Sequence, residues 1–146
     1  MEKVYVVYWS QTGNTQAMAE AIGEGIKAAG KEPVVTEVGS ASLEDLKNAK
    51  AFALGCPAMG AEVLEEMEME PFVEEVEGFA KEKTVALFGS YGWGDGQWMR
   101  DWEERMSEAG ATVLNREGLI CQEMPDEAVL EAVSYTHLTL PTIPWV

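Results

Sequence analysis

The sequence predicts an α/β fold with a doubly wound, five-stranded parallel sheet and helices on both of its faces. Short runs of β-branched and aromatic residues alternate along the chain with segments of helical spacing. Strands separated by helices indicate a parallel sheet that is covered on both sides. Right-handed crossovers then favour the strand order 2-1-3-4-5, which places a ligand crevice at the carboxyl ends of strands one and three.

The elements follow one another in a regular order. We expect strands over residues 4–9, 33–38, 51–56 and 84–88, and a broken fifth strand over 112–114 and 118–121. We expect helices over 15–29, 43–47, 71–78 and 95–109, and a fifth helix that begins at 125–127. Gly30 and Gly110 follow the ends of two of these helices, where glycine readily adopts the left-handed backbone conformation.

Length and composition exclude several classes of protein. The 146 residues are 47% hydrophobic, which suffices for the core of one domain. A net charge of -16 argues against nucleic acid and anionic membrane surfaces as partners. No apolar run is long enough for a membrane span, and Met1 leads directly into the first strand, so we expect no signal peptide and a cytoplasmic location. Cys56 and Cys121 lack the spacing of metal ligands and are expected to be reduced and buried, and no metal site is predicted.

The loop after the first strand is a candidate phosphate site. It consists of Ser10, Gln11, Thr12, Gly13, Asn14 and Thr15. A strand, a polar loop and a helix start together present free N–H groups and a positive helix end to an anion. The loop has no Lys and matches neither G-x-x-x-x-G-K-[ST] nor G-x-G-x-x-G, so it suits one terminal phosphate monoester, as in FMN. The alternative is an ordinary turn with a polar helix cap.

The loops after strands three and four predict a site for a planar ligand. Residues 89–96 contain four glycines with Tyr91 and Trp93, which would bring N–H groups and an indole face against such a ligand. In residues 55–62, Met59 suits the opposite face and Glu62 can accept a hydrogen bond from a ring N–H. The alternatives are a surface aromatic that caps the next helix, for Trp93, and a core residue, for Met59.

Together the three loops resemble those of flavodoxins, specifically the short-chain type of anaerobic fermenting bacteria. The resemblance covers residues 3 to about 133, and residues 88–96 are its most specific part. The matching segments are 8–10, 12–15, 54–56, 58–60, 62–66, 70–72, 85–96 and 98–101. The resemblance implies a flavodoxin-like fold over residues 1–133 and FMN as a non-covalent cofactor.

The resemblance also implies roles for individual residues. Residues 10–15 would bind the phosphate, Met59 would lie on the inner flavin face and Trp93 on the outer face. Glu62 would accept from flavin N3–H, and the Gly60 carbonyl would accept from N5–H after one-electron reduction. The complete set of expected FMN-binding residues is Ser10, Gln11, Thr12, Gly13, Asn14, Thr15, Pro57, Ala58, Met59, Gly60, Ala61, Glu62, Ser90, Tyr91, Gly92, Trp93, Gly94 and Asp95. Pro57 and Ala61 depart from the polar residues of some relatives.

The function that the resemblance implies is electron transfer without catalysis. We expect a low-potential one-electron carrier that shuttles between semiquinone and hydroquinone states. Its partners would be reductases and acceptors normally served by ferredoxin, with basic patches that dock on acidic residues such as those of 62–70. We expect a monomer. The alternatives are an FMN-dependent NAD(P)H:quinone oxidoreductase and a non-redox FMN-binding or docking module.

The last thirteen residues do not fit the pattern. Residues 134–146 contain no Asp, Glu, Lys or Arg and two prolines, where the final helix should carry charges on its outer face. The segment resembles translated sequencing-adapter read-through, and we expect it to be an artefact that replaces the true terminus; the alternative is a genuine short extended tail. The only histidine, His137, lies in it and is given no catalytic or metal-binding role.

Overall fold

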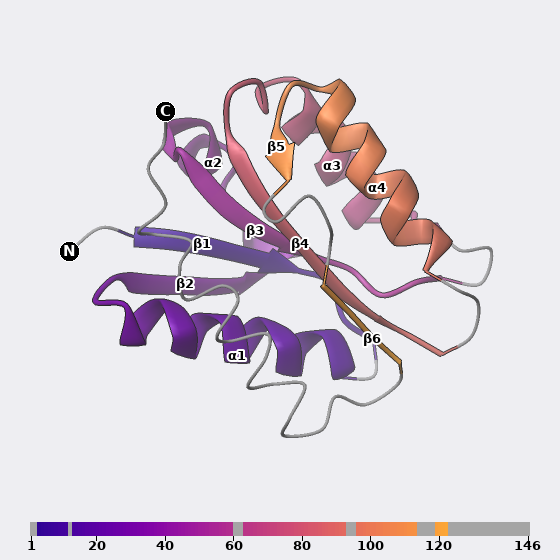
Figure 1. The fold of residues 1–146 in the computed structure, drawn as a ribbon, viewed down its shortest axis with the longest axis horizontal. Helices are drawn as coiled ribbons and strands as arrows, with labels where there is room; N and C mark the ends of the chain where they lie inside the picture. Colours follow the sequence, from indigo (N-terminus) through magenta and orange to yellow (C-terminus); the bar gives the residue numbers. More distant parts are fainter. Residues whose placement is uncertain (1–2, 12, 60–62, 93–95, 114–118, 123–146) are drawn as a thin grey trace.

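A parallel sheet flanked by helices forms the centre of the molecule, which we describe from a computed structural model (Figure 1). The structure describes residues 3–11, 13–59, 63–92, 96–113 and 119–122. The strands are β1 (Lys3–Tyr8), β2 (Glu32–Glu37), β3 (Ala51–Gly55), β4 (Thr84–Tyr91), β5 (Thr112–Val113) and β6 (Leu119–Gln122). The helices are α1 (Asn14–Ala28), the 3-10 turn η1 (Val38–Ser40), α2 (Leu43–Asn48), α3 (Met69–Glu77) and α4 (Gln97–Glu108).

The strand order confirms the predicted topology. The path is β2-β1-β3-β4-β5, and every pairing along it is parallel. The broken fifth strand is also confirmed: β5 pairs with the start of β4 and β6 pairs with its end. The two short strands therefore follow one another along the same neighbour.

The end predicted for the fourth strand was wrong. We expected it to end at residue 88, but β4 continues to Tyr91. The extension pairs with β6, in the register Gly89↔Ile120, Ser90↔Cys121 and Tyr91↔Gln122. Glycine-rich sequence indicates a loop when it is read alone, whereas a neighbouring strand supplies the hydrogen bonds that keep it extended.

The two faces of the sheet are covered by different helices. Successive side chains of a strand point to opposite faces. Val4, Val6 and Tyr8 of β1 accordingly pack in a cluster with Met18 and Ile22 of α1. The cluster on the other face joins the strands to α2, α3 and α4, and its members include Val7, Leu54, Leu87, Leu46, Phe72, Val73, Trp98 and Trp102. Figure 1 shows α1 on one side of the sheet, with α3 and α4 on the other.

Two glycines let β3 and β4 approach each other beneath the candidate site. A Cβ on Gly55 would collide with the ring of Phe88, and one on Gly89 would collide with the carbonyl of Cys56. The chain beyond β3 still follows β4, because Cys56 N–H donates to the Phe88 carbonyl at 3.1 Å and Ala58 N–H donates to the Ser90 carbonyl at 3.0 Å. These contacts place the ends of both strands side by side.

Helix α3 begins earlier than the sequence suggested. We expected it to start at Pro71, and it starts at Met69. Proline is tolerated in the first helical turn, where its missing N–H has no intrahelical acceptor to reach. The predicted fifth helix at 125–127 and the segment 134–146 lie outside the described residues. Within the described part of the chain, no helix is long and apolar enough to cross a membrane.

Candidate functional site

The three predicted loops meet in one pocket at the carboxyl edge of the sheet. Ten predicted residues line it: Ser10, Gln11, Asn14, Thr15, Pro57, Ala58, Met59, Ser90, Tyr91 and Gly92. None of these ten residues carries a charge. The pocket lies where strand order reverses between β1 and β3, the usual place for a ligand in a doubly wound sheet.

Seven further predicted residues lie outside the described part of the chain. They are Thr12, Gly60, Ala61, Glu62, Trp93, Gly94 and Asp95. Gly13 is described and does not line the pocket. It precedes α1 with a φ of 94°, a left-handed conformation that glycine adopts without strain.

The Ser10 hydroxyl organises the loop between β1 and α1. Its Oγ accepts the N–H of Gly13 at 3.1 Å and the N–H of Gln16 at 3.3 Å. The hydroxyl proton of Ser10 is not used in either bond. The first N–H groups of α1, those of Asn14 and Thr15, have no intrahelical acceptor because of their position. The loop thus keeps neutral donors and a positive helix end available to an anion.

The Thr15 hydroxyl contacts β4. We expected it to face a phosphate, but Thr15 is 1% exposed and its Oγ1 lies 3.0 Å from Ser90 Oγ. Thr15 Oγ1 also accepts the Ser90 N–H at 3.3 Å. The two hydroxyls share one of their two protons, so one O–H donor of the pair remains for a ligand. The bond also connects the phosphate loop to the strand that carries the third loop.

The second loop is held by backbone bonds at both ends. Ala58 is fixed to β4 through the Ser90 carbonyl, and Met59 N–H donates to the Val63 carbonyl at 3.0 Å. The side chains of Pro57, Ala58 and Met59 are half-buried. The bond from the Met59 N–H brings Val63 beside Met59.

Tyr91 lines the pocket and also packs against a tryptophan of α4. Its half-buried ring lies 5.6 Å from the ring of Trp98 of α4, at an interplanar angle of 47°, and it also packs against the core. Trp98 Nε1–H donates to the Cys56 carbonyl at 3.0 Å. Trp98, which was not among the expected site residues, thus holds the chain at the base of the pocket. Its signal was its position on the buried face of a helix, with Met99, Trp102 and Met106, and this pattern indicates core packing alone.

Cys56 is buried, and its thiol is free. Burial raises the pKa of this thiol to about 12, although a hydrogen bond from the Glu65 N–H opposes the increase. A thiol with so high a pKa is not a nucleophile at neutral pH. In the described residues, no group of three or more His, Cys, Asp or Glu side chains could hold a metal ion.

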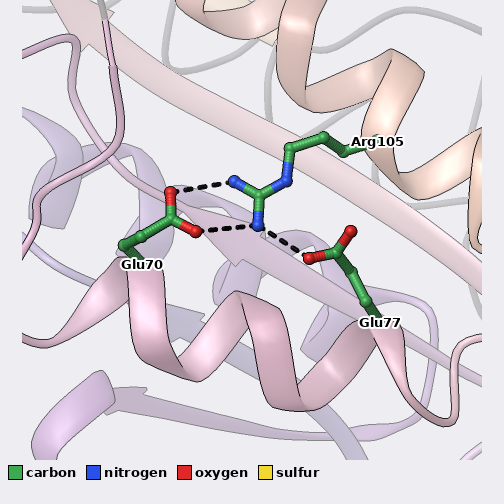
Figure 2. A network of polar contacts seen from close by, with 3 residues as sticks. All are labelled: Glu70, Glu77 and Arg105. Carbon is green, nitrogen blue, oxygen red and sulfur yellow. Dashed lines mark hydrogen bonds and ion pairs between the residues drawn. The ribbon is translucent and has the colours of Figure 1, made fainter.

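The acidic residues that follow the pocket are not a uniform exposed row. Glu66 and Glu68 are exposed, whereas Glu65 is only 6% exposed. Glu70 and Glu77 of α3 both bind Arg105 of α4, as Figure 2 shows, with N–O distances of 2.7 to 2.9 Å. Glu65 and Glu70 of the expected acidic surface are thus engaged within the fold, although the side chain of Glu70 is still 33% exposed.

The geometry of the pocket fits a phosphate monoester that continues into a planar ring. Neutral hydroxyl and N–H donors gather beside the N-terminus of α1, and the half-buried side chains of Met59 and Tyr91 line the same pocket. An anion held by such donors needs no cationic side chain. The pocket therefore fits FMN.

Known proteins resemble this chain in both sequence and fold. The flavodoxin family model matches residues 6–134. A flavodoxin from Clostridium beijerinckii is 51% identical over 130 residues, which cover 89% of this chain and 94% of that protein. A flavodoxin from Megasphaera elsdenii is 46% identical over 125 residues, which cover 86% and 90%. The solution structure of two-electron reduced M. elsdenii flavodoxin gives a TM-score of 0.83 at 40% identity and covers 93% of this chain and 98% of that chain.

These similarities confirm the resemblance drawn from the loop sequences. They extend over nearly the whole chain and nearly the whole length of the relatives. Flavodoxins are FMN-binding electron-transfer proteins rather than enzymes, and this chain belongs to the flavodoxin family.

Proposed function

We propose that the protein is a low-potential one-electron carrier that holds FMN in the uncharged pocket between the β1, β3 and β4 loops. The observation that carries the proposal is the gathering of ten predicted residues, all uncharged, around this one pocket. FMN supplies the one-electron chemistry. The protein binds the cofactor, orients it and sets its potentials. Family membership disfavours the quinone oxidoreductase and the non-redox module.

The phosphate end of the cofactor lies at the start of α1 in this proposal. Ser10 donates its remaining hydroxyl proton, and the Thr15–Ser90 pair donates one more. Asn14 supplies an amide and the helix supplies its free N–H groups. Gln11, Thr12 and Gly13 complete the loop.

The ring end of the cofactor lies between the second and third loops. We place Met59 on one face of the flavin and Trp93 on the other. Residues 57–62 would border its reactive edge, with Glu62 accepting from N3–H and, once the flavin has been reduced by one electron, the Gly60 carbonyl accepting from N5–H. The remaining ring contacts come from Tyr91, Gly92, Gly94 and Asp95, while Ser90 joins the third loop to the phosphate loop through Thr15. The support for these roles is the sequence resemblance and the placement of Met59, Ser90, Tyr91 and Gly92 in the pocket.

Negative charge on the protein opposes full reduction of the cofactor. One carboxylate at ~12 Å, with an effective dielectric constant of ~40, opposes an added electron by about 0.7 kcal/mol, or on the order of 30 mV. The net charge is -16, and the ten described residues that line the pocket include no cation. Several such contributions lower the potential further, and salt screens part of them.

The acidic surface also favours basic redox partners. Glu66 and Glu68 are exposed next to Met67, which is 83% exposed. Charge complementarity of this kind accelerates encounters and selects partners. We propose reductases and acceptors with basic patches, and a protein that acts as a monomer. The free thiol of Cys56 suits a reducing compartment, and we propose the cytoplasm.

Titration with FMN and riboflavin, followed by measurement of the two one-electron potentials, tests the proposal. We expect FMN to bind far more tightly than riboflavin, because only FMN reaches the phosphate loop. We expect the second potential of the bound cofactor to lie well below that of free FMN under the same conditions. Equal affinity for the two flavins, or an unchanged second potential, would contradict the proposal.

A further inference from the structure

We propose that Glu65 is a positioning residue of the FMN site. Its carboxylate fixes the segment that follows Val63, whose carbonyl accepts the Met59 N–H. The inference rests on the proposed placement of FMN. Glu65 does not line the pocket, and it was expected only as one of the acidic residues on the surface. Three features of Glu65 carry it: its burial, its three accepted hydrogen bonds and its bond to the end of β3.

The Glu65 carboxylate collects the N–H groups of the segment that leads into α3. One oxygen accepts the N–H of Met67 at 2.8 Å, and the other accepts those of Glu68 at 2.7 Å and Met69 at 3.0 Å. The Glu65 carbonyl accepts the Glu70 N–H at 2.8 Å. A single residue thus fixes the path of the chain from 65 to 70.

Burial shows that this carboxylate is more than a surface cap. Glu65 is 6% exposed, whereas Glu66 and Glu68 on either side of Met67 are exposed. Burying a carboxylate costs free energy unless hydrogen bonds compensate for the lost water. Burial alone would raise the pKa of Glu65, but the N–H groups of Met69, Glu68 and Met67 lower it overall, so the residue stays ionised at neutral pH.

The Glu65 backbone transmits this order to the pocket. Its N–H donates to Cys56 Sγ at 3.4 Å, which attaches it to the chain at the end of β3. Leu64, the residue before it, is buried in the core. Val63 then presents the carbonyl that accepts the Met59 N–H, and Met59 lines the pocket. A shift of Glu65 would therefore displace Val63, and with it the Met59 side of the pocket.

The test compares Glu65→Gln, Glu65→Asp and the matched control Glu66→Gln in the FMN-bound protein. Glu66→Gln removes one carboxylate charge from the same segment at an exposed position. Dissociation constants for FMN and riboflavin, and the first one-electron potential, are measured for each variant. The ratio of the two dissociation constants reports on the phosphate loop, because only FMN uses that loop.

We expect Glu65→Gln to weaken FMN and riboflavin by the same factor of about ten, as for the loss of bonds to a charged group. The ratio of the two constants then stays at the wild-type value. Glu65→Asp, which keeps the charge on a shorter side chain, weakens both as well. Glu66→Gln changes both by less than about twofold, because surface substitutions have small effects. The first potential moves further in Glu65→Gln than in Glu66→Gln.

Several results would overturn the inference. If Glu65→Gln and Glu66→Gln change the dissociation constants and the first potential equally, the loss of one negative charge explains the effect. Glu65→Asp could bind like the wild type. Glu65→Gln could lower thermal stability while its folded fraction binds riboflavin normally, or it could change the FMN-to-riboflavin ratio. If wild-type protein fails to bind FMN, the proposed function falls as well, so the two failures are distinguishable.

Amide hydrogen exchange of the wild type covers the case in which Glu65→Gln does not fold. The amides of Met67, Glu68 and Met69 donate to the Glu65 carboxylate and report on it directly. We expect FMN to slow their exchange, because a turn held by the flavin stabilises the segment behind it. Exchange that is unaffected by FMN would overturn the inference.

Discussion

The loops after β1 and β3 start from neighbouring strands, but different groups accept the backbone N–H groups beside the helix that follows each loop. After β1, a neutral serine hydroxyl accepts the N–H groups of Gly13 and Gln16 and leaves those of Asn14 and Thr15 at the start of α1 open. After β3, the buried carboxylate of Glu65 accepts the N–H groups of Met67 and Glu68, which precede α3, and that of Met69, its first residue. Both loops border one pocket, but only the first offers donors to an anion.

The difference teaches where an acidic protein can bind an anionic cofactor. A carboxylate that occupies a helix start satisfies its N–H groups and repels a further anion. A hydroxyl organises the loop without adding charge, so the helix end stays available. In a protein with a net charge of -16, the described residues that line the pocket beside this helix end are all neutral.

Gly89→Ala should have the largest effect on stability, because it disturbs the contact between β4 and the chain that follows β3. The new Cβ would meet the Cys56 carbonyl, which is backbone and cannot rotate away. We expect the free energy of unfolding to fall by about 3 kcal/mol, as for overpacking of a dense core. Urea denaturation measures it. Gly92→Ala is the control, since a Cβ there meets nothing within 4 Å, and it should change stability by less than about 0.5 kcal/mol.

Glu65→Gln should remove the carboxylate cap and show a distinct dependence on pH. At pH 7 we expect the apoprotein to lose about 2 kcal/mol, because N–H groups lose a charged acceptor. The pKa of Glu65 is lower in the folded protein than its ordinary value of 4.5. Its stabilisation is therefore complete above that value and disappears as the pH falls through the folded-state pKa.

Urea denaturation of wild type and Glu65→Gln between pH 7 and pH 3 checks this sign. The other acidic residues titrate in both proteins, so the quantity of interest is the difference between them. The difference should be constant above about pH 4.5 and shrink below it. A difference that grows in acid would mean that Glu65 is destabilised as an anion in the folded state.

Arg105→Ala should have a smaller effect, since its partners are one-third exposed. Arg105 bridges Glu70 and Glu77, and the side chains of all three are 28 to 33% exposed. We expect a loss of about 1 kcal/mol at low salt and less in 1 M NaCl, because water and ions screen such pairs. Arg105→Lys should retain only part of the stability. It keeps the positive charge, but an ammonium cannot bind Glu70 through two parallel bonds. A loss that salt does not reduce would point to packing instead of charge.

Ser10→Ala should have the smallest effect on stability but a selective effect on binding. The N–H groups of Gly13 and Gln16 lose their acceptor in a half-buried loop that water can reach, so we expect a cost of about 0.5 kcal/mol. FMN affinity should fall while riboflavin affinity stays near the wild-type value. Calorimetric titration with both flavins measures this contrast. Equal losses for the two flavins would place Ser10 away from the phosphate.

Much of the fold could be predicted because local patterns and the sheet agree. Runs such as Val4–Val7 alternate between the two faces of β1, and their apolar side chains fit the clusters on both sides. The end of β4 could not be predicted in this way. Gly89, Ser90 and Tyr91 resemble a loop, and only the adjacent β6 makes them a strand.

The site was predictable as a set of loops and less so as a set of contacts. Ser10, Gln11, Asn14 and Thr15 after β1 and residues 57–59 after β3 line the described pocket. The hydroxyl of Thr15, by contrast, binds Ser90, which is 75 positions away in the sequence. Glu65 looked like its acidic neighbours, because no local pattern distinguishes a buried carboxylate from an exposed one.

The sequence by itself determined the fold family, the strand order and the three loops that meet at the carboxyl edge, because periodicity and turn residues act locally. Only the tertiary structure decided which hydroxyls and carboxylates are engaged. The Ser90 hydroxyl bonds to that of Thr15, the Glu65 carboxylate accepts N–H groups of the segment that leads into α3, and Glu70 pairs with Arg105. These choices depend on which groups lie within about 3 Å of one another once the chain is packed, and a hydrogen bond at that range is insensitive to separation along the sequence.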